Sequence, residues 1–289
     1  MKIALTLLLS LLPMLAPGAK DTLPVMWEEL RASDFPEAVE RSGGVCIIPM
    51  GVLEKHGPQL PLGTDAITAH EVSVLASGQE YAVVFPFYYF GQINEAKHQP
   101  GCVAYSPELL YMMLDETCQE IARNGFKKII LYNIHGGSTS FISYFCMCQL
   151  HERHDYVVYA AEHRRSPETE RYVQKNVVVK EGGHADEIES ATMMYLRGDL
   201  VDIARAGSED ASNQDRLHTD DLRPGIWWYA KYPNQYAGDA SNATYKLGEV
   251  IVKDRVDELV RMIRSVKDDT VAPALQEEFY DRAENPLAK

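Results

Sequence analysis

Basic residues are scarce in this chain of 289 residues. Lys and Arg together number 28 against 42 Asp and Glu, which gives a formal net charge of −14. A surface with this excess of acid repels the phosphates of DNA and RNA, so the composition argues against a nucleic-acid partner. The same excess does not indicate a cationic substrate, because acidic surfaces mostly serve solubility.

Long apolar runs are also missing after the first residues. The run from Ile3 to about Ala16 follows a lysine and precedes three small residues, Pro17-Gly18-Ala19. This arrangement is typical of a secretory signal peptide and is too short to anchor a mature protein across a bilayer. We therefore expect a signal peptide at 1–19, a single domain at 20–289, no membrane span and a secreted or periplasmic location. The alternative is a buried N-terminal strand or helix.

Cysteines are few, and their number is odd. An exported protein held together by disulfides would be expected to carry an even set, so we predict free, buried thiols instead. The five cysteines are Cys46, Cys102, Cys118, Cys146 and Cys148.

Apolar runs alternate with helical patterns along most of the chain. Such alternation predicts an α/β fold with three α/β/α layers, in which helices cover both faces of a mostly parallel central sheet. The expected strands are 45–50, 81–87, 128–133 and 156–161.

The segment from Glu54 to Asp65 is the most informative part of the chain. It places two carboxylates and the imidazole of His56 within twelve residues, on the loop that follows the first apolar run. Open α/β sheets bind their ligands at the carboxyl ends of strands. Glu54 and His56 are two residues apart, so they point to the same side of an extended backbone and suit a metal centre. The alternative is a polar turn in which Asp65 caps a helix.

A second apolar run ends in Asn133-Ile134-His135-Gly136-Gly137. A histidine at the end of a buried strand is a candidate metal ligand, although a satisfied core histidine is the alternative. Gly136 and Gly137 allow backbone N–H groups to approach a bound anion or a polarised carbonyl closely. We therefore treat both glycines as candidate substrate-binding residues.

A third segment, Gly182-Gly183-His184, leads into a helical pattern. His184 and Glu187 are three residues apart, so they lie on one face at the start of a helix. Acidic residues here also favour the helix dipole, which explains Asp186 and Glu189 without any site. That explanation does not account for the glycines or for His184.

Together, the three segments resemble the creatininase (creatinine amidohydrolase) family from about residue 27 to residue 265. The family's motifs are Glu-x-His-Gly-Pro-His-Leu-Pro-Leu-Gly-Thr-Asp, Asn-Gly-His-Gly-Gly-Asn and His-Ala-Gly-Glu-x-Glu-Thr. The matching residues are Glu54, His56, Gly57, Pro58, Leu60, Pro61, Gly63, Thr64, Asp65, Asn133, His135, Gly136, Gly137, His184, Ala185, Glu187 and Glu189. A weaker match to Glu-His-x-x-x-Pro-Gly-Thr begins at Glu95, with Ala96 in place of the His and Cys102 in place of the Thr.

The resemblance implies a two-metal hydrolase. One metal would be held by Glu54, Asp65 and His135, and the other by His56, Asp65 and Glu187, so that Asp65 bridges them. Carboxylate and imidazole ligands suit zinc or manganese, with iron as a further candidate. Two such ions can activate a bridging water and polarise a scissile carbonyl together. The family is often hexameric, so a homo-oligomer is expected.

Two departures from the family pattern concern the substrate. True creatininases carry a ligand Glu two residues after the loop histidine, where this chain has Gly137, and an acidic residue where it has Gly183. This arrangement is similar to that of family members acting on other amides, such as formamide deformylases and a peptide-trimming peptidase. We therefore expect hydrolysis of a C–N amide bond in a small molecule or peptide other than creatinine. The alternative function is non-catalytic binding of a metal or ligand on the same fold.

Several further residues are candidates for substrate contact and proton transfer. His184 is outside the implied ligand set, and imidazole is the side chain most often used for general acid–base catalysis, so it is the first candidate to protonate the leaving nitrogen. His98 is the second candidate. Cys102 is expected in the wall of the active site rather than as a nucleophile. Trp227 belongs to an aromatic stretch that forms either a pocket wall or a subunit contact.

Overall fold

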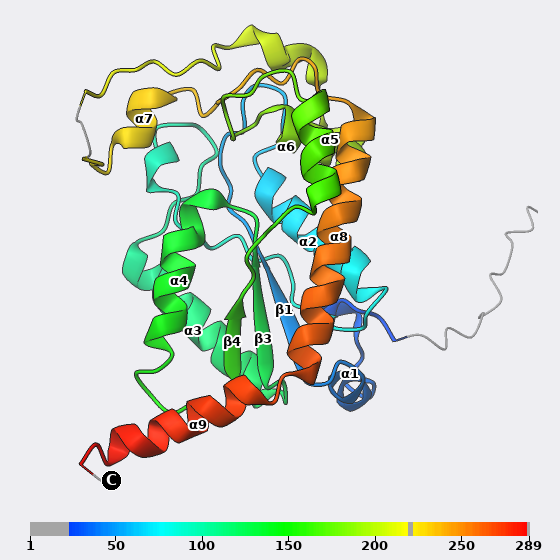
Figure 1. Cartoon of the computed structure of the whole chain (residues 1–289), viewed down its shortest axis with the longest axis vertical. Coiled ribbons are helices and arrows are strands. Elements are labelled where there is room, and N and C mark those ends of the chain that lie inside the picture. The colour runs from blue at the N-terminus through cyan, green and yellow to red at the C-terminus, as the bar shows by residue number, and fades with distance from the viewer. Residues whose placement is uncertain (1–22, 219–221, 288–289) are drawn as a thin grey trace, which may run out of the picture.

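A computed structural model describes residues 23–218 and 222–287 of the chain. The predicted signal peptide at 1–19 lies outside these residues. Figure 1 shows a central sheet between two layers of helices, with the longer loops gathered at one end of the sheet. No helix in 23–218 or 222–287 has the length and hydrophobicity that a membrane span requires.

The sheet is parallel throughout its described part. Its strands are β1 (Val45–Met50), β2 (Val83–Val84), β3 (Lys128–Asn133) and β4 (Val157–Ala160), in the order β2-β1-β3-β4. In the register of the central pair, Ile47 lies opposite Ile130. The strand predicted at 81–87 is much shorter than expected. Pro86 has no N–H to donate to a neighbouring strand, and the pairing ends before it.

One face of the sheet is covered by α1 (Phe35–Arg41), α3 (Pro107–Arg123) and α4 (Thr139–Cys148). Alternate side chains of β1, among them Cys46 and Ile48, point into this layer. The start of α3 is fixed locally, because the Ser106 hydroxyl accepts a hydrogen bond from the Leu109 N–H at 3.3 Å.

The other face is covered by α2 (Thr64–Ser77) and the long helix α8 (Tyr245–Asp268). Here β1 contributes the opposite set of side chains, Val45 and Ile47. Against α8 pack α5 (Pro167–Asn176) and α6 (Glu187–Arg197). The predicted three-layer α/β/α architecture with a parallel sheet is therefore confirmed.

The remaining helices lie at the two ends of the molecule. At the loop end is α7 (Trp227–Lys231), whereas α9 (Val271–Glu284) runs along the opposite end. The short 3-10 segments are η1 (Trp27–Glu29), η2 (Asn94–Ala96), η3 (Gly136–Ser138), η4 (Gly198–Leu200) and η5 (Ile203–Ser208).

All five cysteines are free thiols, as predicted. Cys46 and Cys118 are buried, and burial raises the pKa of both thiols. The other three are only partly buried.

The packing of α8 on α6 yields a testable prediction. A Cβ atom at Gly248 of α8 would lie 1.8 Å from the carbonyl oxygen of Ala191 in α6. We expect Gly248→Ala to force the two helices apart and to lower the free energy of unfolding by roughly 1–3 kcal/mol. The measurement is urea or thermal unfolding. Gly198→Ala is the matched control, because a Cβ there meets no atom within 4 Å. Equal stability of Gly248→Ala and wild type would contradict the close packing.

Candidate metal centre

Two neighbouring strands bring the predicted ligands together. Glu54 and His56 lie on the loop after β1, Asp65 lies in the first turn of α2, and His135 directly follows β3. Because β1 and β3 are parallel and paired, their carboxyl ends meet at the same edge of the sheet. All four side chains are buried, with exposed fractions of 6% or less.

Glu54, Asp65 and His135 form the first group. His135 Nδ1 lies 2.9 Å from Glu54 Oε1 and 3.1 Å from Asp65 Oδ2. The other ring nitrogen, Nε2, lies 2.8 Å from the backbone oxygen of Gln92 and donates to it. Buried polar atoms are normally hydrogen-bonded, yet these two carboxylate oxygens accept no hydrogen bond within the described residues. Two carboxylate oxygens without a hydrogen bond, together with the Nδ1 atom of a ring whose other nitrogen is held by an outer carbonyl, could bind a metal ion.

Asp65 also belongs to a second group, with His56 and Glu189. His56 Nε2 lies 3.2 Å from Asp65 Oδ1 and 3.8 Å from Glu189 Oε2. The other ring nitrogen of His56 faces the backbone oxygen of Glu54 at 3.3 Å. Asp65 therefore presents one oxygen to each group, which is the arrangement of a bridging carboxylate.

The structure places Glu187 outside both groups, so its predicted role as a ligand is not supported by this geometry. Its buried carboxylate accepts hydrogen bonds from the backbone N–H groups of Val178 and Val179, at 3.0 and 2.7 Å. Glu189 lies in the group with His56 and Asp65, where Glu187 was predicted. Glu187 is the first residue of α6 and Glu189 is the third, so their side chains point in different directions. A side chain at the third position reaches back over the N-terminus of the helix.

A signal for Glu189 was present in the sequence. Asp186 caps α6 by accepting from the N–H groups of Ile188 and Glu189, at 2.9 and 3.0 Å. Glu189 in turn accepts from the N–H of Ala185 at 2.5 Å. An acid three residues after an N-cap is the signature of a capping box, which directs its carboxylate toward the turn that carries His184.

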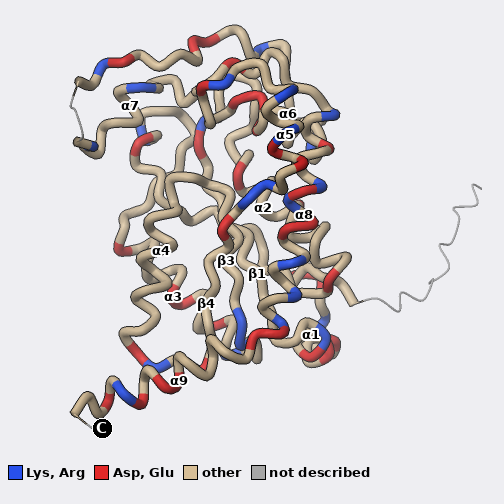
Figure 2. Tube along the Cα trace, viewed as in Figure 1, with Lys and Arg blue, Asp and Glu red and all other residues tan. Residues whose placement is uncertain are grey.

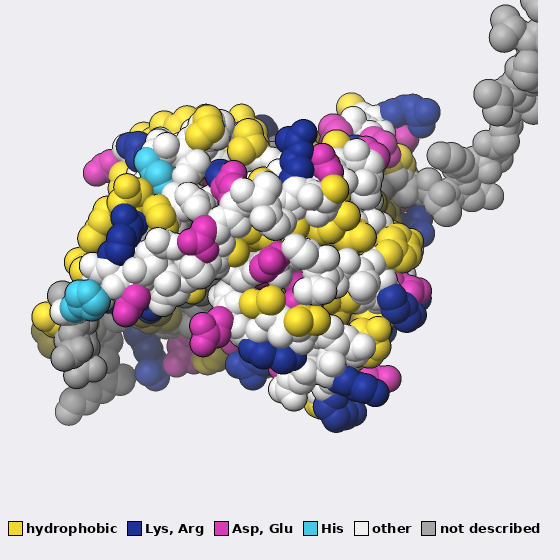
Figure 3. Space-filling view, turned by 90° about the horizontal axis from the view of Figure 1, so that it is seen from above, with side chains coloured by type: hydrophobic (Ala, Val, Ile, Leu, Met, Phe, Trp, Pro, Cys, Tyr) yellow, Lys and Arg dark blue, Asp and Glu magenta, His cyan; other side chains and the backbone are white. Residues whose placement is uncertain are grey.

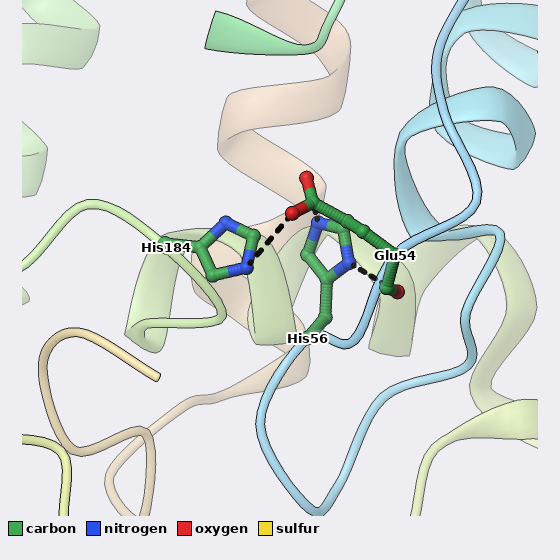
Figure 4. A group of neighbouring side chains, drawn as sticks. All are labelled: Glu54, His56 and His184. Carbon is green, nitrogen blue, oxygen red and sulfur yellow. Dashed lines mark hydrogen bonds and ion pairs between the residues drawn. The ribbon is translucent and has the colours of Figure 1, made fainter. Parts of the chain in front are cut away.

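His184 lies beside the metal groups, as Figure 4 shows together with Glu54 and His56. Its Nε2 is 3.7 Å from Glu54 Oε2 and 2.9 Å from the backbone oxygen of Lys55. The ring centroids of His184 and His56 are 4.3 Å apart. His184 therefore lies close enough to act either on a substrate or as a further ligand.

Gln59 was missed by the sequence analysis. This residue stands where the family motif has its second His. Its buried amide donates to the backbone oxygen of Ala185 at 2.6 Å and to Ser190 Oγ at 3.0 Å. Ala185 has a φ of 56°, which is unfavourable for a residue with a side chain. Gln59 thus links the loop after β1 to the turn that positions His184.

The buried charges stabilise one another. Burial opposes ionisation of Glu54, but the positive charges of His184 and His135 lower the pKa of Glu54 below its ordinary value. Asp65 behaves in the same way, with His56 as the largest favourable partner. Burial would lower the pKa of His56, yet the charge of Asp65 raises it to about 10. A metal ion binding here would therefore compete with protons on the histidines.

A cavity of about 260 Å³ opens over these groups. Gly136 and Gly137 form part of its wall, and a Cβ atom on Gly137 would lie 2.5 Å from His135 Nε2. Trp227 also lines the cavity, and so does its neighbour Trp228. Both rings of the aromatic pair therefore line this cavity, as expected of a pocket wall.

Two predicted site residues are not in this cavity. His98 is exposed, and its Nε2 lies 2.7 Å from the backbone oxygen of Pro233. Cys102 packs behind the wall against a small cluster that includes Ile93, and burial is the main cause that raises the pKa of its thiol to about 11. Its thiol lies 3.8 Å from the backbone oxygen of Ile93, and its predicted place in the pocket wall stays a prediction.

The sequence of this chain is similar to those of known proteins. The sequence model of a family described as "Creatininase: Creatinine amidohydrolase" matches residues 28–263. A creatinine amidohydrolase of Pseudomonas putida is 25% identical over 119 residues, covering 39% of this chain and 46% of the relative. A mycofactocin precursor peptide peptidase of Mycolicibacterium smegmatis is 33% identical over 98 residues, covering 32% and 39%. The chain thus matches less than half the length of either relative.

Solved structures share the fold. A creatininase variant described as Zn-Zn type has a TM-score of 0.73 at 20% identity, covering 86% of this chain and 100% of the other. A structure described as "Creatininase Mn" has a TM-score of 0.70 at 20% identity, covering 85% and 99%. Since the family model spans most of the chain, this protein belongs to the creatininase family.

Proposed function

We propose that this protein is an exported, two-metal amidohydrolase that cleaves a C–N amide bond in a small molecule or peptide. The observation that carries the proposal is the position of Asp65, whose two oxygens face two separate groups of buried ligands. The names of the two relatives, an amidohydrolase and a peptide peptidase, agree with hydrolysis of such a bond.

The donor atoms fit divalent zinc or manganese, with iron as a further candidate. Both groups consist of carboxylate oxygens and imidazole nitrogens, without the thiolates that a structural zinc site favours. The buried oxygens of Glu54 and Asp65 that accept no hydrogen bond within the described residues support the fit. When bound, the two ions supply Lewis acidity and an activated water.

The surrounding residues bind the substrate and move a proton. His184 lies on the cavity wall and is the titratable group best placed to protonate the leaving nitrogen. Gly136 and Gly137 leave backbone groups open to the scissile carbonyl. Trp227 and Trp228 close the other side and exclude water from the bond that breaks.

Creatinine is not the proposed substrate. The creatininase pattern puts a ligand carboxylate at the position of Gly137. In this chain a Cβ there would lie 2.5 Å from His135 Nε2 and 3.0 Å from Glu95 Oε1. The site has no room for that side chain, and Glu189 of α6 supplies the carboxylate from another direction.

We also propose a homo-oligomer, in keeping with the family resemblance. The outer face of α4 supports it, because Tyr144 and Met147 are 65% and 70% exposed there. Exposed apolar side chains on one helix face are typical of an interaction surface.

The first prediction from this proposal concerns metal content. After loading with zinc or manganese and desalting, wild type should retain about two ions per chain. Asp65→Asn should lose both, because it removes the bridging charge, and Glu189→Gln should lose about one. Glu187→Gln is the matched control and should keep both ions, since its carboxylate binds only backbone N–H groups. Elemental analysis measures the metal content. Loss of an ion from Glu187→Gln, with both ions kept in Glu189→Gln, would refute the assignment of Glu189 as a ligand.

A second prediction concerns the proton donor. His184→Ala should lower kcat by roughly 10²–10⁴-fold on an amide found by library screening, with both ions retained. A near-normal rate, combined with a large loss in His98→Ala, would move the role to His98. Loss of metal in His184→Ala would instead make His184 a ligand, in the group that it forms with Glu54 and His56. Metal binding without turnover of any amide would favour the non-catalytic alternative.

The third prediction concerns location. N-terminal sequencing of the natively expressed protein should find a chain that begins near Lys20, in an extracytoplasmic fraction, because 3–16 has the length of a signal sequence's apolar region. An intact Met1 in the cytosolic fraction would contradict export.

A further inference from the structure

A second cavity, of about 660 Å³, opens beside the metal pocket. One wall is the segment 92–98, which contains η2, and the other is the segment 225–229, where α7 begins. Glu95 and Trp227 line both cavities, so the two adjoin at these side chains. A substrate whose amide lies at the metal centre would reach the larger cavity by passing these two side chains.

One lysine and one glutamate are the Lys, Arg, Asp and Glu residues among the described residues that line the larger cavity, whereas the whole chain has a net charge of −14. Lys97 lines it, is exposed, and forms no ion pair with another described residue. Glu95 is the one acidic residue among the described lining residues. Its Oε2 accepts from the amide of Gln92 at 2.9 Å, and its Oε1 lies toward Gly137 on the side of the metal pocket. The acid therefore belongs more to the small cavity than to the large one.

Three further cations lie against the aromatic rings of Trp227 and Tyr229. The guanidinium of Arg223 lies 4.3 Å from the centre of the Trp227 ring, and Lys231 Nζ lies 5.9 Å from the same ring. Arg216 lies 4.9 Å from the ring of Tyr229. Cation–π contacts of this kind fix the positions of the charges. Figure 2 shows the basic positions on and beside α7, and Figure 3 shows basic side chains among apolar ones at the left of the loop end.

We propose that this larger cavity is a substrate subsite for an anionic group, a carboxylate or a phosphate, at the end of the substrate remote from the scissile amide. Lys97 is the residue that determines this specificity, because it is the lining cation without a ring or an acid against it. Trp227 and Tyr229 provide the apolar wall along which the connecting part of the substrate lies. The proposal rests on the proposed function for its choice of scissile bond, but the anion preference is a separate property of the cavity.

The test uses three acetylated tripeptides on the full chain loaded with Mn²⁺. The first ends in a free carboxylate, the second in a neutral carboxamide, and the third is the carboxamide with a phosphoserine as its last residue. Calorimetry gives the dissociation constants, and amine release gives the rate of hydrolysis. We expect at least one anionic peptide to bind roughly 10-fold more tightly than the neutral one, as for a charge-assisted hydrogen bond. The tighter of the two anions identifies the natural group.

Lys97→Met should abolish this preference while leaving the affinity for the neutral peptide unchanged within twofold. Lys253→Met is the matched control, because Lys253 is an exposed lysine of α8 that pairs with Glu249. Equal binding of all three peptides by wild type, or an unchanged preference in Lys97→Met, would overturn the subsite. Anion preference without hydrolysis would count against the proposed function alone, whereas hydrolysis without anion preference would count against the subsite alone.

Discussion

Asp65 is a fully buried carboxylate that faces His56 with one oxygen and His135 with the other. A buried charge of this kind is stable only when opposite charges or metal ions surround it. Its position depends on Gly51, where a Cβ atom would lie 2.2 Å from the backbone nitrogen of Ala66. Only a glycine lets the end of β1 approach the start of α2 so closely. The N-terminus of α2 then favours the negative charge of Asp65.

The rest of the centre is assembled around this carboxylate by elements far apart in the sequence. The pairing of β1 with β3 brings His135 to it, and the packing of α6 on α8 brings Glu189. Gln59 connects these parts, since it lies on the loop after β1 and binds the turn before α6. A mutation at a helix contact such as Gly248 is therefore expected to disturb the second ligand group as well as the stability of the fold.

In the proposed function, the two adjoining cavities bind different parts of the substrate. The small one holds the candidate metal ligands, is buried, and offers room for little more than the scissile bond and its neighbours. The large one is wider and lined by aromatic and basic side chains from α7 and the segment around η2. Family members that share the first cavity can therefore differ in substrate through the loops that form the second. This division follows the general behaviour of α/β folds, in which the sheet fixes the chemistry and the loops fix specificity.

The sequence alone was sufficient for the layered parallel fold and for the segments that form the centre. The apolar runs that became β1 and β3 are rich in β-branched residues. Glu54, His56 and Asp65 come after the first run, and His135 comes after the second. Their convergence follows from local pattern and the geometry of parallel sheets. The backbone contacts of Glu187, His98 and Cys102, in contrast, were decided only by tertiary structure. The physical reason is that each of these three side chains contacts backbone groups nine or more residues away, and the pattern of polar and apolar residues around it does not specify such contacts.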